Sequence, residues 1–407
     1  MGSILIKNIR TLYQTDKGER KRVSGKDMAE VPQLANAWLL LDNGLIQAYG
    51  PMDACPERAD EIIDATNKLV LPAFCDSHTH LVFAKSREEE FVMRVKGRSY
   101  EEIAAAGGGI LNSARRLREA SEGDLLEGAW QRIEEIKGFG TGAVEIKSGY
   151  GLDLESEIKI LRVAKTIKEQ SELIVKTTFL GAHALPVEFK HDRKGYIDLI
   201  IDRMLPVVAD EDLADYCDVF CEKGFFTPEE TDRILEAGWK YGLKPKIHAN
   251  QLHVSGGVQA GVRNNAISVD HLEQITQEEI DCLLGSSTLP VALPSCSFFL
   301  NLPYAPGRDL IDAGLPLVLA TDYNPGSTPS GKVTFLLSLA CIKMKLTPEE
   351  ALNAVTLNGA AAMEIEERAG SIAIGKDARI IITKPMESID YIPYAFGGNL
   401  IEQVILP

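Results

Sequence analysis

Short apolar runs alternate with longer amphipathic segments through the middle of the chain. The runs have the length of buried strands, and the segments between them carry helix-start signals such as Thr227-Pro228-Glu229-Glu230. About eight such repeats predict an α/β protein with a (β/α)8 barrel, and an open doubly wound sheet is the competing fold. The predicted strands span 69–77, 142–147, 174–182, 216–221, 244–249, 266–271, 288–293 and 315–321. The predicted helices include 154–169, 228–241 and 276–284.

Both ends of the chain have a different pattern, with short strands and turns. Asn43-Gly44 separates two apolar runs and predicts a β-hairpin, because both residue types tolerate positive φ. Predicted strands over 371–374 and 379–383 give the C-terminal stretch the same character. We therefore expect a small β-sandwich domain, assembled from both termini, beside the barrel. The expected division is 1–67 with 366–407 for the sandwich and 68–365 for the barrel.

Charge and cysteine content narrow the classes of function. With 43 Lys+Arg against 59 Asp+Glu, the net charge of −16 argues against nucleic acid or an anionic membrane as a partner. The N-terminus lacks the apolar core of a signal peptide, and no apolar run is long enough to span a bilayer. Seven scattered cysteines, an odd number, favour reduced thiols in a cytoplasmic protein. Cys217 and Cys221 have the spacing of a metal clip, but their surroundings predict a buried strand.

Histidines gather where the predicted strands end. In a (β/α)8 barrel these carboxyl ends meet on one face, which carries the active site. Five of the seven histidines lie at or just beyond such an end, and the last strand ends on Asp322. The five are His78, His80, His183, His248 and His271. His191 and His253 lie in polar surroundings and are predicted to be surface residues.

The first two of these histidines indicate a metal site. Residues i and i+2 of a strand share a face, so His78 and His80 can aim at one point, although a chance pair in a surface turn is the alternative. With His248 and Asp322 they supply three nitrogens and a carboxylate and leave a position for water, which is typical of hydrolytic metals. A second metal would need a bridging group at the end of the fourth strand, but that strand ends in Cys221-Glu222. The sequence therefore favours one metal.

The His-x-His of the first strand, the later single histidines and the final aspartate resemble the amidohydrolase superfamily. The closing pattern Gly-Ser-x-x-x-Gly-Lys-x-Ala at 370–378 is similar to that superfamily as well. Arg379 departs from the small acid or amide expected next, and we expect it on a surface of the β domain. Further stretches resemble the imidazolonepropionase family of histidine degradation, from the first strands to the C-terminus. They span 86–87, 104–109, 145–152, 179–183 and 320–327.

This resemblance implies hydrolysis of the cyclic amide of 4-imidazolone-5-propanoate to N-formimidoyl-L-glutamate. It implies one Zn²⁺ or Fe³⁺ per chain, held by His78, His80, His248 and Asp322. Asp322 is then the expected proton carrier, and His271 orients the attacking water or stabilises the oxyanion. Arg87 offers the guanidinium fork that a carboxylate tail requires. The implied substrate contacts are Arg87, Tyr150, His183, Gln251 and Ser327, and the implied product contacts are Asn324 and Gly326.

One departure and several plainer interpretations stand beside this assignment. After His248 the family commonly has Ala-Asp followed by Glu or Gln, whereas this chain has Asn250 and Gln251. An amide at position 251 cannot accept a proton, so it cannot be a general base. Without the resemblance, Arg87 is one more solvated charge, Tyr150 a turn residue, 107–109 a helix stop or a flexible lid, and 324–326 a turn whatever its function.

Two other functions stay open. A deaminase of a nucleobase-like ring would use the same ligands but would not need Arg87, Asn324 and Gly326 to hold carboxylates. A metal-free barrel serving as a scaffold would have no reason to keep ligands at four strand ends. The expected partner is a small-molecule substrate, with no nucleic acid and no membrane. The oligomeric state stays open, with a homodimer as one alternative.

Overall fold

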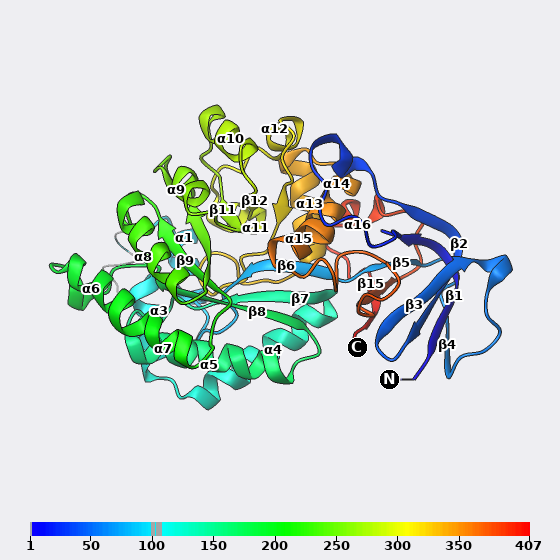
Figure 1. The fold of residues 1–407 in the computed structure, drawn as a ribbon, viewed down its shortest axis with the longest axis horizontal. Coiled ribbons are helices and arrows are strands. Elements are labelled where there is room, and N and C mark those ends of the chain that lie inside the picture. The colour runs from blue at the N-terminus through cyan, green and yellow to red at the C-terminus, as the bar shows by residue number, and fades with distance from the viewer. Residues whose placement is uncertain (1, 99–101, 103–107) are drawn as a thin grey trace.

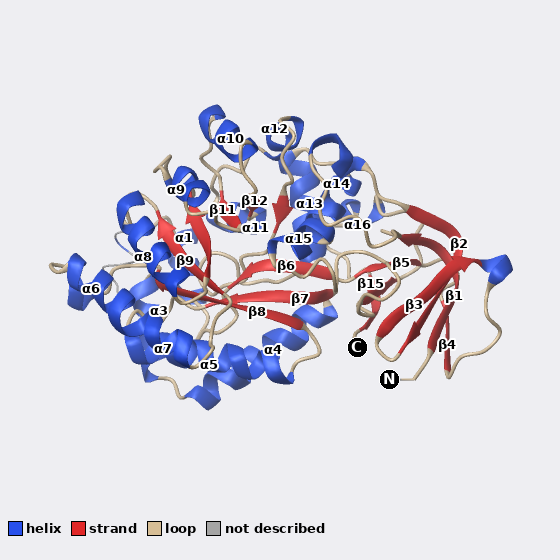
Figure 2. Cartoon of the chain, viewed as in Figure 1, coloured by secondary structure: helices blue, strands red, loops and turns tan. Residues whose placement is uncertain are grey.

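The computed structural model describes residues 2–98, 102 and 108–407. Its largest sheet contains eight parallel strands that follow one another in the order of the chain, from β6 to β13. Helices surround these strands in a nearly closed barrel, and a second sheet lies at one end of the molecule (Figure 1 and Figure 2). The predicted (β/α)8 barrel is therefore confirmed. Its strands are β6 (Phe74–Thr79), β7 (Thr141–Lys147), β8 (Ile174–Ala182), β9 (Tyr216–Cys221), β10 (Lys244–Ala249), β11 (Ser268–His271), β12 (Leu289–Ala292) and β13 (Val318–Leu319).

Hydrogen bonds between the residues that follow β13 and the residues in and after β6 close the barrel. The Asp76 carboxylate accepts from the Thr321 backbone N–H at 3.0 Å and from the Thr321 hydroxyl at 2.6 Å. The Asp322 N–H donates to the His78 carbonyl at 3.0 Å, and the His80 N–H donates to the Tyr323 carbonyl at 2.9 Å. These bonds bring the end of the last strand beside the end of the first. They thereby bring the predicted ligands of the first strand, His78 and His80, beside the predicted ligand Asp322 that follows the last strand.

The helices begin with the signals that the sequence predicts. Thr227 and Thr347 each form a capping box with a glutamate three residues later, with proline at the first helical position. Within the described residues, none of the helices combines the length and the apolar character needed to cross a bilayer. The α-helices are α1 (Glu88–Val95), α3 (Ile110–Glu119), α4 (Glu122–Gly138), α5 (Leu154–Gln170), α6 (Arg193–Leu199), α7 (Leu205–Asp210), α8 (Pro228–Lys240), α9 (Gly257–Arg263), α10 (Gln277–Leu284), α11 (Pro294–Leu300), α12 (Gly307–Asp312), α13 (Val333–Met344), α14 (Pro348–Val355), α15 (Leu357–Ala362) and α16 (Tyr391–Tyr394).

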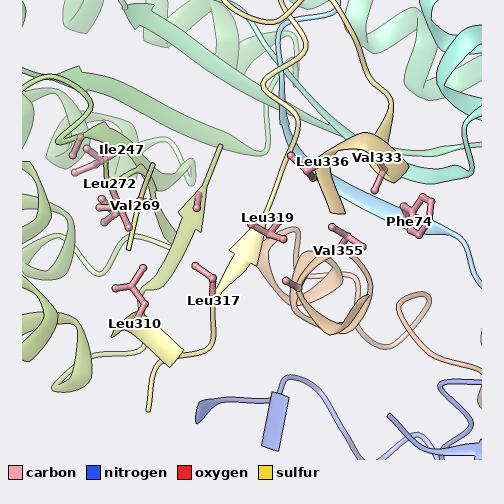
Figure 3. Packing of buried hydrophobic residues seen from close by; sticks show 14 of the residues in the cluster. Phe74, Ile247, Val269, Leu272, Leu310, Leu317, Leu319, Val333, Leu336 and Val355 are labelled. Carbon is pink, nitrogen blue, oxygen red and sulfur yellow. The ribbon is translucent and has the colours of Figure 1, made fainter. Parts of the chain in front are cut away.

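One large apolar cluster fills the space between the barrel strands and the helices outside them. Leu319 of β13, Leu336 of α13 and Val355 of α14 belong to it, and Figure 3 shows part of this cluster. Barrel strands carry apolar residues on their outer face because the helices cover that face. The inner face is thereby left free for the polar residues of the site. The predicted stretch 104–109 overlaps residues 103–107, which lie outside the described residues.

The second sheet combines strands from both termini. Its seven strands run in the order β15-β14-β5-β1-β2-β3, with β4 paired to β1. The predicted hairpin joins β2 to β3, and Asn43 and Gly44 adopt φ values of 50° and 76°. The predicted strand over 371–374 is wrong, because Ile372 makes only an isolated bridge with Thr15. The strands are β1 (Ile4–Tyr13), β2 (Gln33–Asp42), β3 (Leu45–Pro51), β4 (Glu61–Asp64), β5 (Leu69–Pro72), β14 (Ile380–Thr383) and β15 (Ile401–Ile405).

The single strand predicted over 69–77 is two strands in two different sheets. Leu69–Pro72 pairs with β1 and β14 in the second sheet, whereas Phe74–Thr79 opens the barrel. The change of partner occurs at Ala73, whose N–H donates to Arg379, while the next N–H donates to Gly140 of the barrel. Pro72 has no N–H to continue a ladder. The barrel therefore begins at Phe74.

Arg379 is not on a surface of the β domain, as the sequence analysis expected. It is 7% exposed, and its Nη1 donates to the carbonyls of Gly142 and Glu172 at 3.0 and 2.6 Å. Asp377 lies 3.3 Å from its guanidinium. Arg379 thus connects the start of β14 to the two ends of the β7–α5 segment of the barrel. A long guanidinium can make several carbonyl contacts that a small acid or amide could not.

Candidate active site

Four histidine side chains meet at the carboxyl end of the barrel strands. His78 lies on β6 and His80 just after it, His248 lies on β10, and His271 ends β11. The ring centroid of His78 lies 4.4 Å from that of His248, 5.4 Å from that of His80 and 5.8 Å from that of His271. Asp322 follows β13 and brings Oδ1 within 3.6 Å of His78 Nε2. The structure therefore brings together all four residues predicted as metal ligands. His191 and His253 are exposed, as predicted.

Hydrogen bonds determine which nitrogen of two rings faces the centre of this group. His78 Nδ1 lies 2.6 Å from Asp270 Oδ2, and His248 Nδ1 lies 3.1 Å from Asp218 Oδ1. A carboxylate next to Nδ1 makes that atom the N–H donor and leaves a lone pair on Nε2. Both Nε2 atoms are buried and have no hydrogen-bond partner among the described residues. Because buried polar atoms are rarely left unpaired, these two nitrogens fit a bound cation.

His80 and Asp322 add to this candidate metal centre. His80 Nδ1 lies 3.2 Å from a backbone carbonyl oxygen, and its Nε2 lies 3.8 Å from Asp322 Oδ1. Besides the set of His271, Glu273 and Cys296, two sets of described side chains are close enough to share one ion, and both contain His78. One set adds His80 and Asp322, and the other adds His248 and His271. Imidazole nitrogens with one carboxylate suit zinc or iron.

His271 differs from the other three rings in its surroundings. Its φ of 91° lies in a region that few non-glycine residues adopt. Its Nδ1 lies 3.4 Å from Glu273 Oε1, which also accepts from the Ser297 hydroxyl at 3.2 Å. Burial lowers the pKa of His271, but the nearby carboxylates of Glu273, Asp322 and Asp270 raise it by more. This ring is suited to carrying a proton beside the candidate metal centre.

A cavity of about 540 Å³ opens beside the histidines. His183, which lines it, stacks on His80 with ring centroids 5.4 Å apart. Phe220, Phe225 and Leu300 form apolar parts of the wall. All seven residues predicted to contact substrate or product line this one cavity: Arg87, Tyr150, His183, Gln251, Asn324, Gly326 and Ser327.

Two cavity residues have fixed protonation states at neutral pH. Burial lowers the pKa of His183 to about 3, so its ring is neutral. Its Nδ1 lies 3.0 Å from the Gly149 carbonyl, which leaves Nε2 as an acceptor. Burial, followed by the charge of Asp322, raises the pKa of Tyr150, so the phenol keeps its proton. The cavity therefore presents one hydrogen-bond acceptor, His183 Nε2, and one donor, the Tyr150 hydroxyl, to the ring of a bound ligand.

Comparisons with known proteins agree with this geometry. The model of the amidohydrolase family matches residues 223–400. The imidazolonepropionase of Flavobacterium johnsoniae is 57% identical over 403 residues, which cover 99% of this chain and 98% of the relative. That of Caldanaerobacter subterraneus subsp. tengcongensis is 44% identical over 403 residues, covering 99% and 96%. The chain belongs to the imidazolonepropionase family.

Membership of the imidazolonepropionase family makes the chain a hydrolase and sets aside the scaffold alternative. Among solved structures, a 5-methylcytosine deaminase from Klebsiella pneumoniae matches with a TM-score of 0.74 at 15% identity, covering 99% of this chain and 95% of that one. A Xaa-Pro dipeptidase matches with a TM-score of 0.71 at 15% identity, covering 99% and 98%. Likeness at this identity shows the fold alone. The deaminase structure therefore gives the deaminase alternative no support.

A network of buried charges lies beneath the candidate metal centre of this family member, and it was not predicted from the sequence. Lys147 Nζ lies 2.7 Å from Glu145 Oε1, 2.8 Å from Asp218 Oδ2 and 3.7 Å from Asp270 Oδ2. Lys246 pairs with the other oxygen of Glu145. None of these five side chains has exposed surface. Since Asp218 and Asp270 hold two of the candidate ligands, Lys147 links the partners of both.

Asn250 stands where the expected family pattern has Asp, and Gln251 stands where it has Glu or Gln. Asn250 Nδ2 donates to Glu279 Oε1 at 2.6 Å and to the Gln274 carbonyl at 2.8 Å, and both Asn250 and Glu279 are buried. A carboxylate at position 250 would face Glu279 instead, so the amide matches its neighbour. Gln251 lines the cavity, with its Nε2 3.5 Å from Cys296 Sγ.

The turn after Asp322 occupies most of the hydrogen-bonding capacity of Asn324. Its Oδ1 accepts from the backbone N–H groups of Gly326 and Ser327, both at 2.8 Å. Its Nδ2 donates to the Asp322 carbonyl at 2.7 Å and to the Ser327 hydroxyl at 2.6 Å. The Ser327 hydroxyl also lies 3.2 Å from Asp322 Oδ2. Asn324 therefore shapes the cavity wall as a turn residue, and the hydroxyl beside it reaches the candidate proton carrier.

Arg87 is not a solvated charge, because its side chain is only 12% exposed and lines the cavity. Its Nε donates to Glu90 Oε2 at 2.9 Å, and its Nη2 donates to the same oxygen. Glu90 itself is buried. The Nε–Nη2 edge of the guanidinium is therefore occupied by a carboxylate, and the edge that includes Nη1 is the one left for a substrate.

Proposed function

We propose that this hydrolase opens the ring of 4-imidazolone-5-propanoate by hydrolysing its cyclic amide to N-formimidoyl-L-glutamate. One observation carries the proposal. The buried, unpaired Nε2 atoms of His78 and His248 lie next to a carboxylate and beside a cavity that contains Arg87. This arrangement combines a cation site for hydrolysis with a guanidinium for an anionic tail.

We infer that His78, His80, His248 and Asp322 hold one Zn²⁺ or Fe³⁺ ion per chain. Support comes from the two nitrogens that have no partner among the described residues and from the two sets of candidate ligands that share His78. When bound, such an ion would polarise the ring carbonyl and lower the pKa of a water molecule. We assign His271 to orienting the water or stabilising the oxyanion, because burial lowers its pKa but the carboxylates of Glu273, Asp322 and Asp270 raise it by more and favour its protonated form.

In the proposed reaction, the carboxylate of Asp322 carries the proton. Asp322 accepts a proton as the water oxygen bonds to the ring carbonyl carbon, and returns it to the ring nitrogen as the C–N bond breaks. The water oxygen ends in the new carboxylate next to the α-carbon, and the nitrogen becomes part of the formimidoyl group. His271 orients the water or donates to the carbonyl oxygen as negative charge develops there.

The cavity residues are proposed to hold the ring and its tail. The Tyr150 phenol donates, the neutral His183 accepts at Nε2, and Gln251 and Ser327 add an amide and a hydroxyl. Arg87 takes part in binding the propanoate, and Asn324 and Gly326 border the opened product. We also propose that the enzyme works in the cytoplasm, on the basis of its seven free cysteines.

An assay with freshly generated imidazolonepropionate tests the reaction. Zinc- or iron-loaded protein should remove the ultraviolet absorbance of the ring, and mass spectrometry should detect N-formimidoylglutamate, which gains one water relative to the substrate. Deamination would instead release ammonia from an amino-substituted ring. Loaded protein that consumes amino-substituted rings and leaves imidazolonepropionate intact would contradict the proposal.

A further inference from the structure

Three charged residues lie on one side of α1 and its N-cap. Arg87 is the N-cap, and Glu90 and Arg94 follow within the helix three and seven residues later, a spacing that places them on the same side. All three line the cavity beside the metal centre. From the sequence, only Arg87 could be singled out in this highly charged stretch.

No hydrogen bond joins Glu90 to Arg94 among the described residues, although the charge of Glu90 partly offsets the lowering of the Arg94 pKa by burial. Its Oε2 accepts from Nε and Nη2 of Arg87, and its Oε1 accepts from the Gly109 N–H at 3.0 Å. Burial raises the pKa of Glu90, but its bonds to Arg87 lower it overall, so the carboxylate is ionised. Its single negative charge is thus matched by the single positive charge of Arg87.

One N–H donor of Arg94 has no partner among the described residues. Its Nη1 is buried, and it has no hydrogen-bond partner in residues 2–98, 102 and 108–407. Its Cζ lies 5.6 Å from the ring centroid of Phe299, so one face of the guanidinium packs on an aromatic ring. Burial, followed by the charge of Arg87, lowers the pKa of Arg94. A buried guanidinium N–H without an acceptor, in a cavity wall, is positioned to receive the acceptor from a ligand.

The charges in this part of the cavity also leave one positive charge unmatched. Arg87 and Arg94 face one carboxylate, and Glu90 is the only acid among the described residues that line the cavity. Arg98, which also lines it, pairs with Glu102 and is mostly exposed. One additional carboxylate would therefore balance the charge. The proposed substrate carries one carboxylate in its propanoate tail.

We propose that Arg94 is a specificity-determining residue that binds the propanoate carboxylate together with Arg87. This inference rests on the proposed function. Arg87 contributes its remaining Nη1, which lies so close to Gly326 that a Cβ there would overlap it. Arg94 contributes its unpaired Nη1. The tail is thus held between two guanidinium groups, and Glu90 holds the first of them in place.

The test compares Arg94→Ala with wild type on two substrates, imidazolonepropionate and its propanamide counterpart, using the zinc-loaded full chain. For the propanoate, KM should rise about 10–100-fold and kcat should change little, because the tail is remote from the reacting carbonyl. For the propanamide, the change in kcat/KM should stay within about threefold. Arg94→Lys should recover part of the loss, because it restores the charge without the planar donor. Arg116→Ala is the matched control, since Arg116 contacts Ser86 and Glu89 near the same helix but does not line the cavity.

Equal losses on both substrates would show that Arg94 only supports the structure, and no loss on either would overturn its role in binding. Calorimetric titration with imidazole-4-propanoate and imidazole-4-propanamide measures binding alone. It therefore tests the role of Arg94 independently of whether the protein hydrolyses imidazolonepropionate. If wild type fails to hydrolyse imidazolonepropionate, the proposed function fails. The binding site is still upheld if Arg94→Ala weakens binding of the propanoate alone, and it is overturned if both ligands bind as to wild type.

Discussion

Replacing Lys147 by methionine should weaken the fold, because it removes a buried ammonium between carboxylates. The variant keeps an unbranched apolar chain as far as Cε and removes the ammonium that lies 2.7 Å from Glu145 and 2.8 Å from Asp218. Removing one member of a buried ion pair costs about 3–5 kcal/mol, since the remaining charge stays buried. The free energy of unfolding of the metal-free protein should fall by about that amount. Denaturation in urea, followed by circular dichroism, measures it.

The same variant should also bind metal less tightly. Asp218 and Asp270, both close to Lys147, hold Nδ1 of His248 and His78. Loss of groups that orient a metal ligand typically lowers affinity by about 10–100-fold. Competition with a chelating indicator measures Kd for zinc on the folded protein.

Lys376→Met is the matched control for both measurements. Lys376 is also buried, but its Nζ donates to the Ala369 carbonyl at 3.1 Å and to the Ser371 hydroxyl at 2.8 Å. This variant should lose stability and keep Kd for zinc within about twofold, because distant sites act independently. If Lys147→Met lost stability in the same way and bound zinc as wild type does, the network would serve the fold alone. That result would refute the link between Lys147 and the ligands.

Three further changes test the rest of the site. His248→Ala should lose most bound metal and most activity, and its fold should stay intact. His253→Ala, at an exposed histidine, should keep both metal and activity. Metal analysis that finds two tightly bound ions per wild-type chain would contradict a single-metal centre. His271→Ala should keep the metal and lower kcat roughly 10²–10⁴-fold, and loss of the metal would instead make His271 a ligand. Asn250→Asp should lower the free energy of unfolding at pH 7 by at least about 1–3 kcal/mol, because a second carboxylate would face buried Glu279. Adding Glu279→Gln should recover most of that loss by restoring a donor between the two side chains; no recovery in thermal or urea unfolding would refute this explanation.

The barrel could be predicted from the sequence because its strands are covered on the outside and appear as continuous apolar runs. The predicted bounds of β9 and β10 agree with the structure. The same continuity hid the break at Pro72, since the run 69–75 stays apolar while the backbone changes from one sheet to the other. The apolar pattern indicates burial, but it does not indicate which strand is the hydrogen-bond partner.

The candidate ligands could be predicted because histidines at strand ends are rare and strand ends meet on one face. The groups that hold them could not, because lysine and glutamate are usually exposed. Glu145 and Lys147 nevertheless gave a signal, since they alternate along β7 and must point to the same side of it. Arg94 gave none, because the charges on α1 are equally compatible with a solvated helix face. Only its unpaired nitrogen in the cavity distinguishes it.

The buried charges explain why a cation would be held where the histidines meet. Glu145, Asp218 and Asp270 face two ammonium groups, so one negative charge remains beneath the rings when all are ionised. Above them, Asp322 adds a carboxylate, and two imidazole lone pairs have no partner within the described residues. A bound cation would satisfy both the charge and the lone pairs, and it would stabilise the folded state by mass action. The stability of the barrel and the affinity of the site are therefore coupled through Lys147, which is the cation that keeps both orienting carboxylates in place.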